Sequence, residues 1–424
     1  SNFSVYLDKQ MQQVTSNNTV DNVTPGSYTL KVTHEGYTNW VQDIVVREGL
    51  VTDVAAQLFP QELQLEQLTK TNIRSIVFTD DHREAFYVVT DSPLGANIGL
   101  WQQNLVKSNI PLIEEGPIKI SNLTGEIQQA ITTGDFQIIP SPSRSKLLLM
   151  AGQSIYVLDA GRYNEPDVTN LLSISYTVET VEWLSDNNLI IGSENLLIDY
   201  DVASTQQTLI SFYNDHTPIY TKQKNSLVFV DNGKLYRYQD KHTTEVELDN
   251  ITLPSGITAL FSGTDNDSNL VMATATDLFF LYIPESYLQD LGQMSLLDVS
   301  PTGRNLLVSD SQNNIKSVQI NVSLVRNVVE YQNRATTLPA TIALSSINWE
   351  PNSGYFAFRD TGYATKIFSA DRTGNNVAEI LDSSGVITDQ PFNTSPDGSG
   401  LFLLLRDNDQ TDSRLNLYLL KFGE

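Results

Sequence analysis

The 424-residue sequence predicts an all-β protein in which a small N-terminal β-sandwich precedes a β-propeller. Short apolar runs rich in Val, Ile, Leu, Tyr and Phe alternate with Asn, Asp, Gly, Ser and Pro, a pattern typical of strands joined by turns. Convincing amphipathic helices are absent, since the best candidate, residues 285–294, contains Gly292 and is too short to organise a domain. A weak internal repeat of about 45 residues fills the larger, C-terminal part.

The first unit covers residues 1–60. Turn residues, among them Pro25-Gly26 and Glu35-Gly36, separate its strand-like runs, and glycine adopts a positive φ at such turns without steric cost. Several short strands in a unit of this size predict a small β-sandwich. The strands are expected at residues 5–7, 27–33, 42–47 and 51–58.

The N-terminal unit resembles the PEGA domain. The resemblance rests on Pro25-Gly26 with Tyr28 and Val32, on Gly36-Tyr37, and on the closing Leu58-Phe59-Pro60. The Pro-Glu-Gly-Ala that names the family is missing at the front, where Asn2-Phe3-Ser4 stands. The family implies a surface-associated, non-catalytic spacer beside a larger extracytoplasmic domain.

The segment 61–424 divides into eight units, each with a short apolar strand, a polar turn, a strongly apolar strand and a hairpin into a third strand. A length of about 45 residues is typical of a four-stranded propeller blade, so we expect eight blades, with seven as the alternative. The second strand of each unit is apolar throughout because neighbouring blades cover both of its faces. These strands are expected at residues 85–89, 147–150, 189–191, 227–230, 270–273, 306–308, 355–358 and 401–405.

Turns between the first and second strands carry a second resemblance. Ser300-Pro301-Thr302-Gly303, Ser395-Pro396-Asp397-Gly398 and Ser141-Pro142 look like the Ser-Pro-Asp-Gly turns of the propeller in the Tol translocation system and of prolyl-oligopeptidase-type propellers. Proline presets φ in such a turn, and glycine takes the left-handed position. No unit ends in the Trp-Asp pair of WD repeats.

Closure of the ring is also predicted. The strand-like segment 62–69 has no blade of its own, and the chain ends in a strand over residues 415–422. We expect residues 62–69 to add the outer strand to the last blade, because both ends of the propeller would then lock one blade and leave few open edges.

Composition limits the class of partner. Asp and Glu number 50 against 26 Lys and Arg, a formal charge of −24, which disfavours nucleic acid and anionic membrane surfaces. The absence of cysteine excludes disulfides and thiolate chemistry. No apolar run approaches the roughly 18–20 residues of a membrane-spanning helix. We expect an extracytoplasmic location, at the cell surface or in the periplasm, with any membrane attachment through an N-terminal anchor ahead of Ser1.

Signals for catalysis or metal binding are weak. The histidines, His34, His82, His216 and His242, have no metal-binding spacing, and no Gly-x-Ser-x-Gly, Walker or Rossmann pattern occurs. Residues 407–412 alternate carboxylates and amides as calcium would accept, but they lack the glycine and the final glutamate of a calcium loop. We therefore expect no catalytic residue, no metal and no cofactor, with calcium as a minor alternative.

Long loops predict one candidate binding face. Loops between second and third strands lie on the usual ligand face of a propeller, and the longest of them fall in the first, seventh and eighth units, which become neighbours when the ring closes. They cover residues 90–98, 359–366 and 406–414, with the link 116–134 on the same side. The binding residues expected on this acidic face are Asp91, Tyr363, Asp407, Asp409 and Asp412.

These observations favour a non-enzymatic binding or scaffolding protein that presents a propeller face to a protein or a cell-envelope polysaccharide. The alternative is a propeller-type glycosidase or lyase that uses carboxylates of the central channel. A deep channel pocket with paired carboxylates would favour the enzyme, whereas a channel filled by apolar or small side chains would favour the scaffold.

Overall fold

The computed structural model describes residues 3–422 except 55, 63, 91–97, 107–115, 124, 166–170, 214–217, 225, 264–266, 313, 324–327, 336–341, 361–362, 373, 375, 383–386 and 407–413. The described part is almost entirely β-structure, which confirms the predicted fold class. One helix, α1 (Gly125–Thr133), and one short 3-10 turn, η1 (Ile283–Glu285), are found in it.

The N-terminal unit is an antiparallel four-stranded sheet of order β2-β1-β3-β4. Its strands are β1 (Ser4–Leu7), β2 (Gln10–Gln12), β3 (Gly26–Thr33) and β4 (Trp40–Val46). Val5, Leu7, Leu30 and Trp40 form its core. The strand predicted over residues 51–58 is wrong, because the described residues there cross the apolar face of the sheet, where Val54 and Leu58 pack, instead of pairing with its edge.

Eight further sheets follow in the part of the chain that the structure describes. The first four contain β6 (Ile73–Phe78), β7 (Glu84–Val89), β8 (Gly99–Asn104) and β9 (Ile118–Ser121); β10 (Phe136–Pro140), β11 (Lys146–Ala151) and β12 (Ser154–Asp159); β13 (Thr180–Ser185), β14 (Asn188–Gly192), β15 (Leu196–Asp201) and β16 (Gln207–Phe212); and β17 (Ile219–Gln223), β18 (Ser226–Asp231), β19 (Lys234–Gln239) and β20 (His242–Glu245).

The remaining four sheets contain β21 (Ile257–Phe261), β22 (Asn269–Thr274), β23 (Leu278–Tyr282) and β24 (Tyr287–Gly292); β25 (Met294–Val299), β26 (Asn305–Asp310), β27 (Ile315–Ser323) and β28 (Val328–Ala335); β29 (Ile342–Trp349), β30 (Tyr355–Asp360), β31 (Tyr363–Asp371) and β32 (Ala378–Asp382); and β33 (Ile387–Thr394), β34 (Gly400–Arg406), β35 (Leu415–Lys421) and β5 (Gln64–Gln67).

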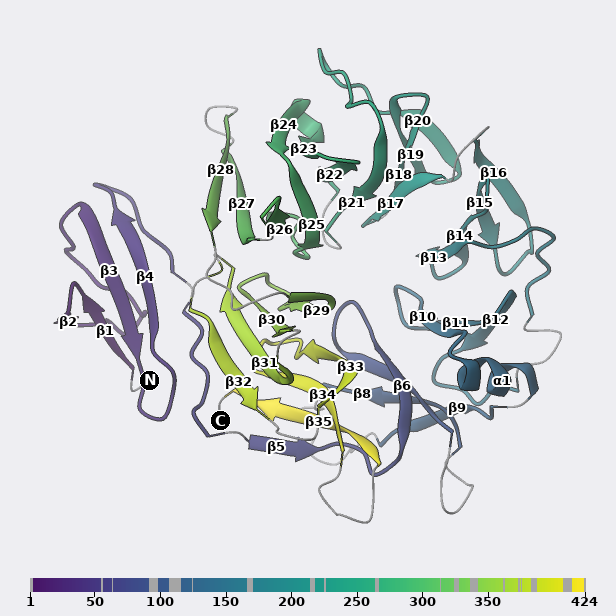
Figure 1. Cartoon of the computed structure of the whole chain (residues 1–424), viewed down its shortest axis with the longest axis horizontal. Helices are drawn as coiled ribbons and strands as arrows, with labels where there is room; N and C mark the ends of the chain where they lie inside the picture. Colours follow the sequence, from purple (N-terminus) through teal and green to yellow (C-terminus); the bar gives the residue numbers. More distant parts are fainter. Residues whose placement is uncertain are drawn as a thin grey trace.

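The sheets follow one another around a ring, as a propeller requires (Figure 1). First strands of consecutive sheets contact each other, for example β17 with β21 and β29 with β33, so these strands line the centre. Contacts of β33 with β6 bring the last sheet beside the first. In the last sheet, β5 pairs antiparallel with β35, and the ion pair Lys421–Glu66, at 2.8 Å, joins the two strands.

The second strand of each sheet carries most of the core. Ala85 to Val89 in β7 and Leu401 to Leu405 in β34 are buried without alternation. The expectation of continuously apolar second strands is confirmed for these sheets, because side chains on both faces of the strand pack against adjacent sheets.

Residues 285–294, the best helical candidate in the sequence, form no α-helix, as expected from Gly292 and their short length, because Tyr287–Gly292 pairs as strand β24 with β23. The helix instead lies in the link 116–134, where Ile127, Ala130 and Ile131 of α1 pack into the core shared by the first two sheets. The helix has only nine residues, too few for the helical spacing of its apolar residues to be recognised in the sequence.

Candidate functional site

The acidic face predicted from the loops is largely outside the described residues. Asp91, Asp407, Asp409 and Asp412 all fall there, and Tyr363 is described only as the first residue of β31. The long loop expected over residues 359–366 is wrong, because β31 already begins at Tyr363, which pairs with Asp360 of β30 after a register shift from the pair Arg359–Ile367. Only two residues separate these strands, so this hairpin contributes no long loop to the predicted face.

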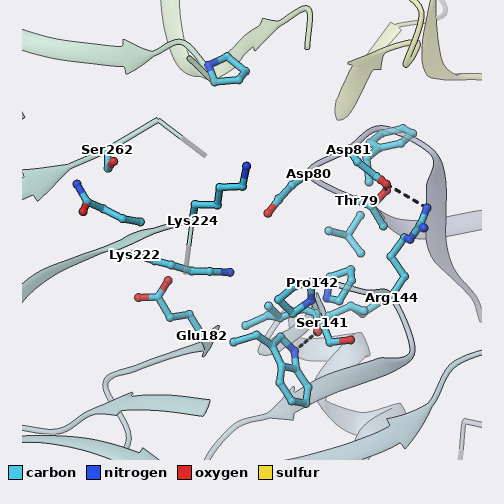
Figure 2. A pocket seen from close by; sticks show the side chains of 18 of the residues that line it. Thr79, Asp80, Asp81, Ser141, Pro142, Arg144, Glu182, Lys222, Lys224 and Ser262 are labelled. Atoms are coloured by element: carbon cyan, nitrogen blue, oxygen red, sulfur yellow. Dashed lines mark hydrogen bonds and ion pairs between the residues drawn. The ribbon is translucent and has the colours of Figure 1, made fainter. Parts of the chain in front are cut away.

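A cavity of about 680 Å³ lies instead where the first strands meet their turns (Figure 2). Seven of the sheets contribute to its lining, so we call it the central cavity. It lies at the end of the strands where first and second strands connect, opposite the face predicted from the longer loops. Its lining comes from residues 77–81, 138–142 and 221–224, together with Arg144, Glu182, Trp183, Ser262, Pro301 and Pro351.

Apolar side chains form one wall of the central cavity. Phe78 and Ile139 are half-buried, and Trp183 is almost completely buried. The Trp183 indole N–H donates a 2.8 Å hydrogen bond to the Ile139 carbonyl, which holds the second and third sheets together. This wall is therefore rigid and has no free donor at the indole.

An ion pair at the rim of the central cavity connects two sheets and stabilises the fold. Arg144, in the turn after β10, lies 3.0 Å from Asp81 and 3.6 Å from Glu84. Asp81 also accepts a 2.7 Å hydrogen bond from the Thr79 hydroxyl. These contacts join the first sheet to the second. The side chains of Asp81 and Arg144 are therefore paired with each other before any ligand binds.

Four other charged side chains of the lining are unpaired. Within the described residues, Asp80, Glu182, Lys222 and Lys224 make no hydrogen bond or ion pair through their side chains. Asp80 and Lys224 are exposed, whereas Glu182 and Lys222 are half-buried on β13 and β17. Figure 2 shows all four around the open space of the cavity. Since unpaired charges in a preformed cavity are available to a ligand, these four define the candidate site.

Burial controls the protonation of Glu182. Its pKa is raised chiefly by loss of solvent around the carboxyl group, and the negative charge of Asp80 raises it further. The ammonium group of Lys222 acts in the opposite direction and lowers this pKa. Glu182 and Lys222 therefore influence each other although no hydrogen bond joins them.

The central cavity can bind polar and charged groups. Its lining includes hydroxyl groups of Ser141, Thr221 and Ser262, and none of its described residues is a histidine. No group of three or more metal-ligating side chains is found in the described part of the chain. The described helices also include none that is long and apolar enough to cross a membrane.

A second cavity, of about 960 Å³, lies in the N-terminal unit. Its wall includes Leu7, Leu30 and Ile44 on the apolar face of the sheet, together with polar residues of the surrounding loops such as Asn18 and Thr52. Charged residues of both signs, Asp21, Arg47, Glu48 and Asp53, also line this cavity.

Sequence reasoning missed the central cavity because its charged residues form no motif. Two features of the sequence could nevertheless have indicated it. Lys222 and Lys224 come just after one predicted first strand, and Asp80-Asp81 comes just after another. First strands line the centre of a propeller, so charged residues at their ends are candidates for the channel.

Residues 1–62 match the PEGA domain, which confirms the resemblance proposed from the sequence. A search of curated proteins found no match to the chain. Among solved structures, the chain is similar to the WD40 domain of SCAP from fission yeast, with 9% identity, coverage of 85% of this chain and 98% of that chain, and a TM-score of 0.47. It is also similar to the Dos1 propeller (14% identity, 85% and 96% coverage, TM-score 0.45) and to an oligogalacturonate lyase in complex with manganese (12%, 68% and 89%, TM-score 0.41).

Proposed function

We propose that this chain is a non-enzymatic, extracytoplasmic binding protein that holds part of a protein or a cell-envelope glycan in the central cavity. The observation that carries the proposal is the set of four unpaired charged side chains, Asp80, Glu182, Lys222 and Lys224, around a preformed space. The PEGA domain supports the location, since it typically occurs in extracytoplasmic proteins. In this proposal it acts as the spacer that presents the propeller.

The size and lining of the cavity support binding. A volume of about 680 Å³ lies within the range of roughly 300–1,000 Å³ found for sites that enclose small ligands or short segments. The buried Trp183 and the ion pair Asp81–Arg144 keep the walls in place before a ligand arrives. A preformed wall lowers the entropic cost of binding.

The test is capture of cell-envelope proteins and glycans by the whole chain. Wild type is compared with Lys222→Ala/Lys224→Ala, which removes both unpaired lysines and is expected to lose most capture. The matched control is Lys234→Ala/Lys241→Ala, which removes two lysines of the same sheet that are engaged in outer ion pairs with Glu245 and Asp201. Equal capture by wild type and the first variant would contradict the proposal.

The acidic face predicted from the loops is tested in the same experiment. A variant with Asp407, Asp409 and Asp412 changed to Ser alters the predicted face and none of the described lining residues of the central cavity. If only this variant loses capture, the binding site is the predicted face and not the central cavity.

A second candidate function is a glycosidase or lyase, favoured by one observation. Asp80 and Glu182 line the same cavity, and the raised pKa of Glu182 is the property that a general acid needs. In that case the protein would release reducing or unsaturated sugar ends from envelope polysaccharide, and Glu182→Gln would lower the rate by at least about 100-fold. Absence of turnover in wild type would exclude this candidate for the polysaccharides used.

A further inference from the structure

The charges around the central cavity are not equally available. Asp81 is held by Arg144 at 3.0 Å. Glu182 lies in the electrostatic field of Lys222, so each offsets part of the other's charge. Asp80 and Lys224 remain, one of each sign, without a hydrogen bond or ion pair to any described residue.

Asp80 and Lys224 belong to different sides of the ring. Asp80 is in the turn that follows β6 of the first sheet, and Lys224 is in the turn that follows β17 of the fourth sheet. Figure 2 shows both side chains directed into the open space from their separate turns. The cavity therefore has a negative pole at Asp80 and a positive pole at Lys224.

A ligand with charge of one sign only would match one pole and be repelled by the other. A ligand with one charge of each sign would match both, and its orientation would be determined by the poles. Phe78 and Ile139 of the same lining offer apolar surface to an uncharged part of the ligand. The lining thus favours a compact zwitterion with an apolar centre.

We infer that the central cavity binds a short peptide with charged termini, its α-ammonium group against Asp80 and its terminal carboxylate against Lys224. This inference rests on the proposed function, in which the central cavity is the binding site. A short peptide has the required opposite charges at its two ends and places apolar side chains between them. Its size also suits the volume of about 680 Å³.

The test measures binding of the peptide Ala-Leu-Ala to the whole chain by calorimetry, with the peptide in four forms: free, N-acetylated, C-amidated and blocked at both ends. Each block removes one charge and leaves the middle of the peptide unchanged. For wild type, each single block is expected to weaken binding about tenfold or more, since a charge-assisted hydrogen bond is lost.

Variants of Asp80 and Lys224 test which terminus of the peptide each of these residues binds. In Asp80→Asn, acetylation should cost little while amidation still costs about tenfold, and in Lys224→Gln the pattern should be reversed. Lys234→Gln is the matched control in the sheet that carries Lys224, and it should behave as wild type. Both target residues are exposed in turns, so thermal unfolding of the variants should match wild type and confirm their fold.

Three outcomes would overturn the inference: equal binding of all four peptide forms by wild type, no binding of any form, or the same response to blocking in wild type and both variants. Failure of the proposed function looks different. A chain that captures envelope material through Lys222 and Lys224 but binds no peptide form keeps the proposed function and loses only the peptide assignment. A chain that does neither loses both.

Discussion

Single buried polar side chains tie neighbouring sheets together. Asp199 on β15 is buried and accepts hydrogen bonds from Asn188 at 2.7 Å and from the Tyr238 hydroxyl of the next sheet at 2.6 Å. Between the last and first sheets, the His82 Nδ1 lies 2.9 Å from both the carbonyl and the hydroxyl oxygen of Thr394. Such contacts satisfy polar groups in the core and position one blade against another.

His82 should make the stability of the protein depend on pH. Burial lowers its pKa below the ordinary 6.5, although the Thr394 hydrogen bond and the charges of Asp80, Asp81 and Glu350 act in the opposite direction. The unfolded chain therefore binds the proton more readily, and the contribution of neutral His82 to stability is lost as the pH falls below about 6.5. We expect the free energy of unfolding from urea titrations to fall less between pH 7 and pH 5 in His82→Gln than in wild type.

The control for this prediction is His242→Gln. His242 is exposed, and this variant should follow the wild-type pH dependence. Parallel curves for wild type and His82→Gln would show that His82 does not contribute.

Asp298 should act in the opposite direction. This carboxyl group on β25 is largely buried, and burial raises its pKa to about 6, while the hydrogen bond from the Val299 N–H lowers it. The folded state therefore holds the proton more tightly, and the resulting stabilisation is present below pH 3.8 and lost as the pH rises through 6. Asp298→Asn, neutral at every pH, should raise the free energy of unfolding at pH 7.5 by about 1–3 kcal/mol.

The same variant should match wild type near pH 4, because Asp298 is then largely protonated in the folded protein. Denaturant unfolding at the two pH values measures both differences. A gain in stability that is equal at pH 4 and pH 7.5 would mean that the carboxyl charge is not the cause.

At the scale of elements, the outer strand of the last sheet comes from the opposite end of the propeller segment. β5 pairs with β35 from Gln67 opposite Tyr418 to Gln64 opposite Lys421. Beyond β5, the Leu68 N–H donates to the Leu417 carbonyl at 2.8 Å, and the Thr69 hydroxyl accepts from the Leu417 N–H at 2.9 Å. The strand thus connects the start of the ring to its end along one continuous ladder.

Replacing Gln64–Gln67 with Gly-Ser-Gly-Ser should destabilise the propeller as a whole. Glycine and serine favour an unpaired backbone, and the replacement also removes the Lys421–Glu66 ion pair. The Tm of the propeller is therefore expected to fall by roughly 5 °C. Calorimetric melting provides the measurement. A replacement of β2, Gln10–Gln12, by Gly-Ser-Gly is the control, since it alters an outer strand of the other unit and should leave the propeller transition in place.

At the scale of the whole molecule, the N-terminal unit is fastened to the propeller. Phe59 is buried and packs edge-on against Phe422 and Tyr355, with ring centroids 4.9 and 5.9 Å apart. The Thr38 N–H donates to the Phe59 carbonyl at 2.8 Å, so the same residue is bound to the N-terminal unit. The N-terminal unit therefore holds a defined position beside the seventh and eighth sheets (Figure 1).

Phe59→Ala should loosen this attachment. Loss of a buried aromatic ring typically lowers the free energy of unfolding by about 3 kcal/mol or more, and here it also releases the N-terminal unit. We expect faster proteolysis between the two units and a larger radius of gyration in small-angle scattering. Phe212→Ala, which removes an exposed ring, is the control and should leave both measurements unchanged.

Much of the fold follows from local patterns in the sequence. Continuous apolar runs such as 401–405 predict strands covered on both faces, and Pro25-Gly26 with Gly36-Tyr37 predicts the PEGA domain. These features depend on neighbours in the sequence, because alternation and turn chemistry act over a few residues. Helix α1 and strand β24 were not predicted, because each is determined by its packing or pairing partner and not by its own sequence pattern.

The sequence by itself determined the all-β class, the buried second strands and the nature of the N-terminal unit. Only the tertiary structure decided where charges of opposite sign face the same space. Asp80, Glu182 and Lys224 are separated by long stretches of sequence, and they share one cavity because ring closure brings the ends of the first strands to a common centre. The spacing of these residues in the sequence does not predict that they meet, because the cavity is formed by contacts between sheets and not within any one of them.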